Sequence, residues 1–215
     1  MIIAIDGPAG SGKSTTAKLL AEKLDFIYLD TGAMYRAITF YFLQNSIDIE
    51  NSGQINKILS KINLSIHFKN QFEVHIEGED VTDSIRSIEV NDFVSSVSKI
   101  VQVRKKMVKI QRLFSYNRNI VVEGRDIGSY VFPNAEFKFF LIANIAERAK
   151  RRLKEMKDNP SITVSNLVKK LDERDRIDSN RLISPLIKAN DAVEIDTTSL
   201  TINEQVNKLY NIIKN

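Results

Sequence analysis

The sequence of 215 residues contains no cysteine, and this absence excludes disulfide bonds, thiolate metal sites and cysteine nucleophiles. No run of about eighteen apolar residues is present, so we expect no transmembrane helix. The N-terminus lacks the basic stretch and apolar segment of a secretory signal peptide. These absences are compatible with the cytoplasm, where we expect the protein to act without contact with a membrane.

Acid–base signatures are also missing, since neither a Ser-His-Asp arrangement nor a pair of catalytic carboxylates can be recognised. The two histidines, His67 and His75, fall on the polar faces of two alternating segments, 64–68 and 72–77. A metal site needs more ligands than this pattern offers, which favours a solvated face of a small antiparallel sheet. A third strand of that sheet is predicted at 81–82.

The hydrophobic content of 43% and charged content of 27% are ordinary for one globular domain, with room for a small insertion. The net charge is only +4, but the segment 99–118 holds seven basic and no acidic residues, and 148–157 is similarly basic. Nucleic-acid binding therefore stays an alternative. The apolar side chains Val103, Met107, Ile110 and Phe114 on one side of 99–118 instead favour a solvated helix face.

Residues 7–14, Gly-Pro-Ala-Gly-Ser-Gly-Lys-Ser, fit the phosphate-binding pattern of Gly, four residues and Gly-Lys-Ser/Thr. An apolar, β-branched run at 2–5 predicts a buried strand before the motif, and an amphipathic pattern at 14–24 predicts a helix after it. A glycine-rich turn without a ligand is the alternative. The strand–turn–helix context favours a nucleoside triphosphate site.

The chemistry of this loop follows from its residue types. Glycines allow positive φ and a close approach of backbone N–H groups to phosphate, and the helix N-terminus adds a partial positive charge. Lys13 is expected to reach the β- and γ-phosphates, and the Ser14 hydroxyl to ligate Mg²⁺. The predicted ATP-binding residues are Gly7, Pro8, Ala9, Gly10, Ser11, Gly12, Lys13, Ser14 and Thr15.

The remaining pattern alternates strands with helices. Buried strands are predicted at 26–29, 119–123, 136–142 and 192–195, and helices at 34–44, 54–62, 87–98, 102–115, 147–156 and 164–181, with a chain break at 157–160. A capping box at 201–204 predicts the start of a C-terminal helix. The antiparallel segments within this α/β order indicate an inserted subdomain.

Two of these strands end in polar loops, at 30–32 and 124–128, where an α/β sheet binds its ligands. Thr31 and Arg36 follow the first strand, and Arg125 and Asp126 the second. A surface helix cation and a surface ion pair are the alternative interpretations. Arg174, Asp178 and Arg181 would share one helix face, and a salt-bridged exposed helix would explain that spacing equally well.

Phosphoryl transfer requires positioning and charge neutralisation more than acid–base groups. A phosphate acceptor is largely ionised at neutral pH, because its second pKa is about 6, and therefore needs no general base. Guanidinium groups that grip phosphate are needed instead. The sequence supplies Arg36, Arg104, Arg125, Arg151, Arg174 and Arg181, which predicts a small-molecule kinase.

Five stretches, 5–14, 29–36, 77–82, 123–128 and 173–181, make nearly the whole chain resemble the bacterial cytidylate kinases. The resemblance implies a P-loop NTPase fold of the α/β class, with a five-stranded parallel sheet flanked by helices. It implies a core of 1–33, 84–147 and 182–215, an acceptor-binding insertion at 34–83 and a lid region at 148–181. The implied reaction transfers the γ-phosphate of ATP to CMP or dCMP, with Mg²⁺.

Carried over by position, the resemblance gives roles to individual residues. Arg36 and Arg125 would hold the acceptor phosphate, with Thr31 near the acceptor. Ser95, Arg104 and Asp126 would contact cytosine, and Asp178 the ribose. Lys13, Arg151, Arg174 and Arg181 form the expected catalytic set, in which Arg151 comes from the lid. Ile177 stands where relatives often have arginine.

The sequence leaves several alternative functions open. Another small acceptor, such as UMP, AMP or shikimate, would suit the same loop, and a nucleic-acid-binding ATPase or a non-catalytic nucleotide sensor would use it differently. We expect a monomer with small-molecule substrates and no nucleic acid. The sequence leaves undecided the preference between CMP and dCMP, and whether Glu123 or another carboxylate supports Mg²⁺.

Overall fold

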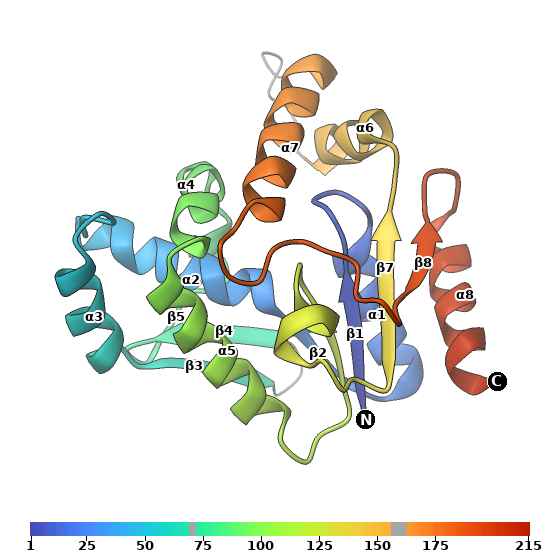
Figure 1. The fold of residues 1–215 in the computed structure, drawn as a ribbon, viewed down its shortest axis with the longest axis horizontal. Coiled ribbons are helices and arrows are strands. Elements are labelled where there is room, and N and C mark those ends of the chain that lie inside the picture. Colours follow the sequence, from blue (N-terminus) through green and yellow to red (C-terminus); the bar gives the residue numbers. More distant parts are fainter. Residues whose placement is uncertain (69–71, 156–162) are drawn as a thin grey trace. The chain divides into compact units, whose positions relative to one another are not determined.

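The structure is a computed structural model that describes residues 1–68, 72–155 and 163–215 (Figure 1). The chain divides into two units, which we describe separately. Unit 1 contains residues 1–28 and 119–215, and unit 2 contains residues 29–118. In the described residues, no helix is both long and apolar enough to span a membrane.

The sheet that organises unit 1 has, in the described residues, five parallel strands in the order β2-β6-β1-β7-β8. Its first strand β1 pairs in parallel with β6 on one side and β7 on the other. The strands are β1 (Ile2–Asp6), β2 (Ile27–Asp30), β6 (Ile120–Glu123), β7 (Phe137–Ile142) and β8 (Val193–Asp196). The strands that the apolar runs predict, and the five-stranded sheet that the resemblance implies, are thus confirmed.

The core of unit 1 lies between this sheet and its neighbouring helices. Ile3, Ile5 and Val121 from the sheet are fully buried together with Leu20 of α1 and Leu209 of α8. Ala4 and Val122 are fully buried on the opposite face of the same strands, so the sheet is covered on both faces, as the unbroken apolar runs require. The central position of β1 brings the phosphate-binding pattern to the carboxyl edge of the sheet.

The helices of unit 1 begin close to the predicted residues. They are α1 (Lys13–Leu24), α6 (Ile145–Glu155), α7 (Val164–Ser179) and α8 (Ile202–Lys214). The capping box at Thr201 and Glu204 is present in both directions, which confirms that prediction. A short apolar cluster of Ala149, Leu167 and Leu171 packs α6 against α7. The predicted chain break at 157–160 lies outside the described residues.

Unit 2 combines helices with a small antiparallel sheet in the order β3-β4-β5. Its elements are α2 (Thr31–Gln44), α3 (Ser52–Lys61), β3 (Leu64–Phe68), β4 (Phe72–Ile76), β5 (Glu79–Asp80), the 3-10 turn η1 (Ser84–Arg86), α4 (Ile88–Ser98) and α5 (Val101–Ser115). The antiparallel pairing that the alternating segments predict is confirmed. One face of this sheet buries Val74 and Ile76.

Three local predictions are wrong. The loop expected at 30–32 is absent, because Asp30 caps helix α2 directly, accepting a hydrogen bond from Ala33 N at 2.8 Å. The third antiparallel strand lies at Glu79–Asp80 instead of 81–82, since Glu77 and Gly78 both have positive φ and turn the chain within two residues. The loop expected at 124–128 becomes the π-helical turn η2 (Ile127–Val131) from its fourth residue.

Candidate active site

The loop between β1 and α1 has the backbone geometry of a phosphate cradle. Gly7, Gly10 and Gly12 all have positive φ, as predicted. A Cβ at Gly7 would lie 2.1 Å from the carbonyl oxygen of Leu141, so only glycine fits there. No side chain of the described residues caps α1 at Gly12, and its first N–H groups are therefore directed at the space where an anion binds.

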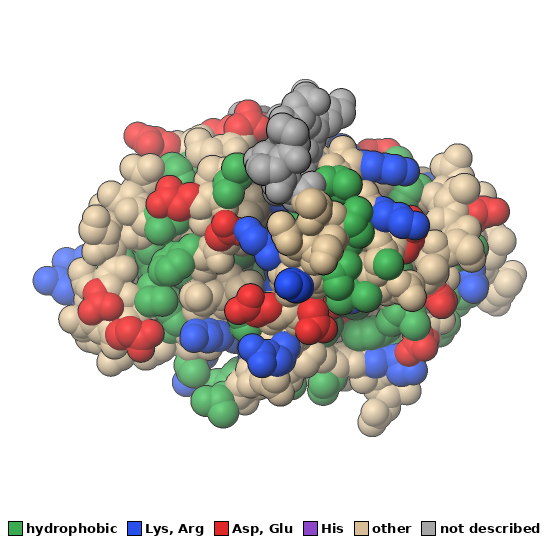
Figure 2. Space-filling view, turned by 90° about the horizontal axis from the view of Figure 1, so that it is seen from above, with side chains coloured by type: hydrophobic (Ala, Val, Ile, Leu, Met, Phe, Trp, Pro, Cys, Tyr) green, Lys and Arg blue, Asp and Glu red, His purple; other side chains and the backbone are tan. Residues whose placement is uncertain are grey.

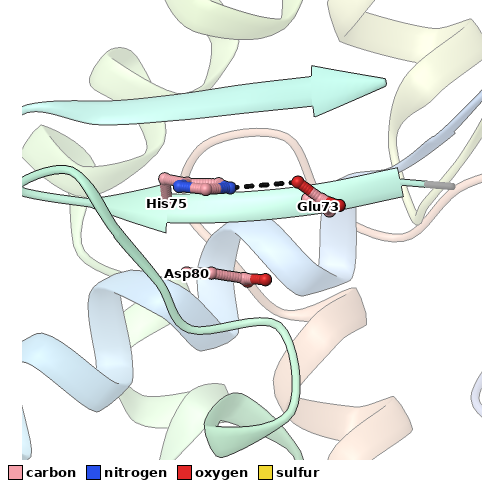
Figure 3. A group of neighbouring side chains, drawn as sticks. All are labelled: Glu73, His75 and Asp80. Carbon is pink, nitrogen blue, oxygen red and sulfur yellow. Dashed lines mark hydrogen bonds and ion pairs between the residues drawn. The ribbon is translucent and has the colours of Figure 1, made fainter. Parts of the chain in front are cut away.

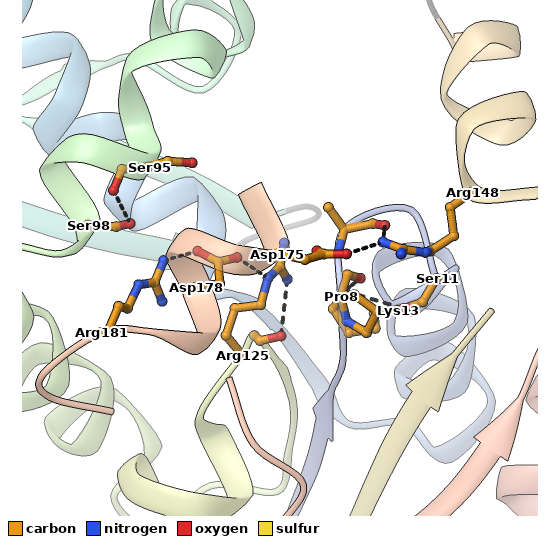
Figure 4. Close-up of polar contacts among 12 residues, drawn as sticks. Pro8, Ser11, Lys13, Ser95, Ser98, Arg125, Arg148, Asp175, Asp178 and Arg181 are labelled. Carbon is orange, nitrogen blue, oxygen red and sulfur yellow. Dashed lines mark hydrogen bonds and ion pairs between the residues drawn. The ribbon is translucent and has the colours of Figure 1, made fainter. Parts of the chain in front are cut away.

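Lys13 is the first residue of α1, and its side chain is buried inside the loop. Its Nζ donates to the carbonyl oxygen of Pro8 at 2.7 Å and lies 3.5 Å from Ser11 Oγ (Figure 4). Burial, followed by the nearby charge of Arg125, lowers the pKa of Lys13 to about 7. A bound polyphosphate would reverse this shift, because it supplies negative charge where the loop now places cations.

A hydroxyl and a carboxylate meet beside the loop. Ser14 Oγ donates to Glu123 Oε1 at 2.6 Å, and the Tyr28 hydroxyl donates to the same oxygen at 3.1 Å. Glu123 is the last residue of β6 and is buried, whereas Ser14 is exposed. Neutral and anionic oxygens of this kind are the ligands that Mg²⁺ prefers.

Asp6, at the end of β1, fixes the segment that follows β6. Its two carboxylate oxygens accept hydrogen bonds from Ile127 N at 2.8 Å and Gly128 N at 2.7 Å. Burial raises the pKa of Asp6 to about 7, against the opposing effect of these two N–H groups. The contact holds Arg125 and Asp126 at the carboxyl edge of the sheet, and Asp126 itself is buried.

Two arginines from different segments share one buried carboxylate. Arg125 Nε donates to Asp178 Oδ2 at 2.9 Å, and Arg181 donates to the other oxygen of Asp178 (Figure 4). Burial acts to raise the pKa of Asp178, but the neighbouring guanidinium groups, Arg125 first, outweigh it and lower the pKa. The predicted helix to residue 181 is wrong in its last residues, because α7 ends at Ser179 and Arg181 follows it. Arg181 nevertheless reaches Asp178, and with Arg125 it forms a buried charge network within unit 1.

Arg148 and Asp175 form a contact that the sequence analysis missed. Arg148 Nη1 donates to Asp175 Oδ2 at 2.5 Å and to the carbonyl oxygen of Ala9 at 3.1 Å, and Ala9 N donates to Asp175 Oδ1 at 3.4 Å. Both helices, α6 and α7, are thereby attached to the phosphate loop. Arg148 lies three residues before Arg151 on a strongly basic helix. The sequence of that helix does not reveal that Asp175 is the partner of Arg148.

Arg151, the predicted lid arginine, contacts the segment after β8. Its guanidinium donates to the carbonyl oxygen of Thr197 at 2.5 Å and to Thr197 Oγ1 at 3.1 Å. Thr197 Oγ1 in turn donates to the carbonyl oxygen of Ser11 at 2.9 Å. A second connection therefore runs from α6 to the phosphate loop.

In unit 2, Arg36 is held by the residue that caps its own helix. Arg36 Nη2 donates to Asp30 Oδ2 at 2.9 Å, and both side chains are largely buried. The buried Nε of Arg36 has no hydrogen-bond partner among the described residues. A buried guanidinium with an unused donor is suited to an oxyanion. Thr31, the first residue of the helix, is also buried.

The other predicted residues of unit 2 lie around Ser98. Arg104 is 1% exposed, donates to the carbonyl oxygen of Ser98 at 3.2 Å, and places its guanidinium 5.3 Å from the ring centre of Tyr35. Ser98 Oγ donates to the carbonyl oxygen of Ser95 at 3.2 Å. Arg104 thus belongs to the interior of unit 2 and not to an exposed basic face.

The predicted site residues therefore form two sets. Unit 1 brings together the phosphate loop, Glu123, Arg125, Asp178 and Arg181, and Arg174 contributes its charge to the environment of Lys13 and Asp178. Unit 2 carries Thr31, Arg36, Ser95 and Arg104.

A phosphate loop of this geometry at the central strand of a five-stranded parallel sheet defines the P-loop NTPase class. Solved structures agree on the fold: the shikimate kinase of Bacteroides thetaiotaomicron superposes with a TM-score of 0.53 at 11% identity, covering 100% of this chain and 99% of that one. The Acinetobacter baumannii shikimate kinase, in complex with shikimate, gives 0.51 at 18% identity, covering 99% and 92%.

Within that class, the chain belongs to the cytidylate kinase family, which it matches over residues 3–215. It is 46% identical over 214 residues to the cytidylate kinase of Clostridioides difficile, covering 99% of this chain and 98% of the relative. The Fusobacterium nucleatum cytidylate kinase is 49% identical over 96% and 94% of the two chains. That of Bacillus subtilis is 45% identical over 99% and 96%.

Proposed function

We propose that this protein transfers the γ-phosphate of ATP to CMP or dCMP, giving ADP and CDP or dCDP. The observation that carries the proposal is the network in which Arg125 and Arg181 share Asp178, in the unit that also holds Lys13. Family membership supplies the acceptor, because the curated relatives are cytidylate kinases.

On the donor side, the loop 7–15 would bind the phosphates of ATP through its backbone N–H groups. Lys13 would leave the carbonyl oxygen of Pro8 and contact the β- and γ-phosphates. Arg151, Arg174 and Arg181 would neutralise the charge that spreads over the transferred group. The contacts of Arg148 and Arg151 with the loop and with Thr197 would set the position of α6 relative to it.

The residues present fit a magnesium ion. Ser14 would ligate it directly, and Glu123, whose Oε1 accepts from Ser14 Oγ, would support it through water. Bound there with ATP, Mg²⁺ supplies neutralisation of phosphate charge. We therefore name Glu123 as the carboxylate that the sequence left undecided.

On the acceptor side, we assign the phosphate of CMP to Arg36 and Arg125. The unused Nε of Arg36 offers a donor to a phosphate oxygen, and Arg125, held in place by Asp178 and by the carbonyl oxygen of Gly124, would add its positive charge. The nucleophilic phosphate oxygen is already ionised at neutral pH, so no general base is required. Positioning and charge neutralisation are then the whole contribution of the chain.

We assign recognition of cytosine to Ser95, Arg104 and Asp126. A carboxylate such as Asp126 accepts a hydrogen bond from the exocyclic amine of cytosine, whereas the carbonyl of uracil at that place would repel it. Asp178 would contact the ribose, and the Asp178 network would close over the acceptor. Thr31 would lie near the acceptor.

We retain four further parts of the sequence interpretation as proposals. Residues 34–83 would be the acceptor-binding insertion, and 148–181 the lid that moves as ATP binds. The protein would act as a monomer, in the cytoplasm, where its nucleotide substrates are made.

The experiment that tests the function is release of ADP from ATP and Mg²⁺ with CMP, dCMP, UMP, AMP, shikimate or no acceptor, in parallel. We expect turnover with CMP and dCMP far above that with the other acceptors. Preferred turnover with another acceptor would refute the cytosine assignment and leave the phosphate loop intact. Equal hydrolysis without acceptor would refute a kinase function.

Asp126→Asn tests the base assignment separately. We expect the preference for CMP over UMP, measured as a ratio of kcat/KM, to narrow by roughly tenfold or more, because the amide no longer repels the uracil carbonyl. Asp80→Asn makes the same chemical change on the antiparallel sheet and should leave the ratio unchanged. An unchanged ratio in Asp126→Asn would remove that residue from base recognition.

A further inference from the structure

The antiparallel sheet of unit 2 carries both histidines of the chain on one face. His75 lies opposite Asp80 on one neighbouring strand, and His67 lies opposite Glu73 across the β3–β4 pair. Four side chains that ligate metal ions are therefore adjacent on three strands. The proposed kinase function makes no use of any of them.

The donor atoms of this face form a close group. Glu73, His75 and Asp80 each offer one ligand atom, and these three atoms all lie within 4.8 Å of one another (Figure 3). His75 Nε2 and Glu73 Oε2 are 3.2 Å apart. Two ligands about 2.0–2.1 Å from a tetrahedral zinc ion are themselves separated by about 3.3 Å, so this pair already has the spacing of coordinated atoms.

Neighbouring residues orient the ligands. Asp80 Oδ1 accepts from Thr82 N at 2.9 Å and from Thr82 Oγ1 at 2.6 Å, which fixes the carboxylate and leaves its second oxygen for another partner. Outer hydrogen bonds of this kind are what hold ligating carboxylates in place. The strands themselves are anchored by Val74 and Ile76, which are buried on the opposite face.

His67 is the fourth candidate. Its ring centre lies 4.4 Å from that of His75, and its Nε2 is 3.0 Å from Ser65 Oγ. It lies outside the group of three, and a rotation of its side chain would be needed to bring a nitrogen to a shared ion. Asp80 could not be placed beside the histidines from the sequence, because its position on β5 depends on the turn at 77–78.

We propose that Glu73, His75 and Asp80, completed by His67, bind one divalent transition-metal ion of the zinc class. A mixed set of imidazole and carboxylate ligands favours Zn²⁺, Ni²⁺ or Cu²⁺ over Mg²⁺ and Ca²⁺, which prefer oxygen alone. The ion would join side chains from β3, β4 and β5. It is separate from the magnesium that accompanies ATP.

The test is calorimetric titration of Zn²⁺ into the full chain, stripped with chelator, free of any histidine tag, and without nucleotide. We expect one ion per chain. His75→Gln and Asp80→Asn should each weaken binding by roughly tenfold or more, the scale on which metal sites respond to lost ligation. Glu79→Gln is the matched control: Glu79 precedes Asp80 on β5, points to the other face, and its loss of charge should leave the affinity unchanged.

Two further measurements separate this site from other binding. The chain has only two histidines, so their ring signals in NMR report directly, and both should shift on addition of one equivalent of Zn²⁺. Ser14→Ala, which removes a ligand from the phosphate loop, should leave zinc uptake unchanged. Absence of uptake, or uptake that His75→Gln and Asp80→Asn weaken by less than tenfold, would overturn the proposal, since either result means that the face is an ordinary surface.

Discussion

Helices α5 and α6 have similar basic compositions but differ in what their cations contact. On α6, Arg148 is 8% exposed and bonds the phosphate loop and Asp175, and Arg151 bonds Thr197. On α5, Lys105 and Lys109 are exposed. Of its other cations, Arg104 is buried in unit 2, and Lys106 donates to the carbonyl oxygens of Leu59 and Ile62 at the end of α3.

The difference shows that a cluster of basic residues in a sequence need not form an exposed basic surface in the folded protein. The buried cation of each helix, Arg104 on α5 and Arg148 on α6, is an arginine, whose planar fork satisfies several acceptors at once and is more weakly hydrated than an ammonium group. Exposed cations of α5 include both types, Arg112 as well as Lys105 and Lys109. Blue and red side chains are interspersed on the face drawn in Figure 2. The segment 99–118, the basis of the nucleic-acid alternative, thus uses its charges for packing, helix capping and solvation.

Arg181→Lys should give the largest effect among the variants that sharpen this comparison. It keeps the charge but removes the fork that contacts Asp178, so we expect kcat with CMP to fall roughly 10²-fold. Arg176→Lys, the same change at an exposed position in the last turn of α7, is the control. Turnover near that of the parent in Arg181→Lys would show that the contact of Arg181 with Asp178 is structural and not needed for phosphoryl transfer.

Arg148→Met tests the attachment of α6 to the phosphate loop. Removing one partner of this buried pair should lower the free energy of unfolding by about 3 kcal/mol and reduce kcat/KM for ATP roughly tenfold. Denaturant unfolding and steady-state kinetics measure the two quantities. Arg152→Met, which breaks only the more exposed pair with Glu155, should change stability by less than about 1 kcal/mol. An equal loss of unfolding free energy in both variants would show that the buried pair of Arg148 contributes no more to stability than the exposed pair of Arg152.

Lys13, a lysine buried among the arginines of unit 1, should make nucleotide binding depend on pH. Its pKa, lowered to about 7, leaves the amine mostly neutral at pH 8, whereas bound phosphates favour the charged form. Binding of ADP should therefore take up close to one proton at pH 8 and almost none at pH 6. Calorimetry in buffers of different ionisation enthalpy measures this uptake, and Lys13→Met should abolish it. Uptake that is the same at both pH values would contradict the assignment.

The smallest effects are expected on α5. Lys105→Gln with Lys109→Gln should leave kcat within about twofold and the free energy of unfolding within about 0.5 kcal/mol, since both side chains are exposed. Lys106→Met should cost about 1 kcal/mol, because it removes donors from the end of α3. A loss of activity in the double variant would show that this helix serves a ligand after all.

The sequence predicts the parts of this protein whose cause is local. Apolar runs give the strands, the glycine pattern gives the phosphate loop, and Thr201 with Glu204 gives the start of α8. The error at 30–32 is of a different kind: Asp30 is as well suited to ending a loop as to capping a helix, and only the hydrogen bond to Ala33 N decides between them.

Contacts between distant segments could not be predicted in this way. Arg148 and Asp175 meet because Ala149 packs α6 against α7, which no local pattern encodes. The charge network of Asp178 depends in the same way on the segment that follows β6. In both cases the sequence identifies the residues as charged and leaves their partners to the tertiary packing.

The path of the chain between the two units has a consequence for how such a protein can change. Unit 1 is left within β2 and rejoined at the start of β6, and there Ile27 N donates to the carbonyl oxygen of Asn119 at 3.0 Å. Both ends of unit 2 are thus fastened at adjacent points of one sheet. Changes of length within residues 31–118 can therefore leave the strand pairing of unit 1 and the nucleotide loop unaltered, whereas Arg125, Asp126 and Asp178, which we assign to the acceptor, belong to unit 1 together with that loop.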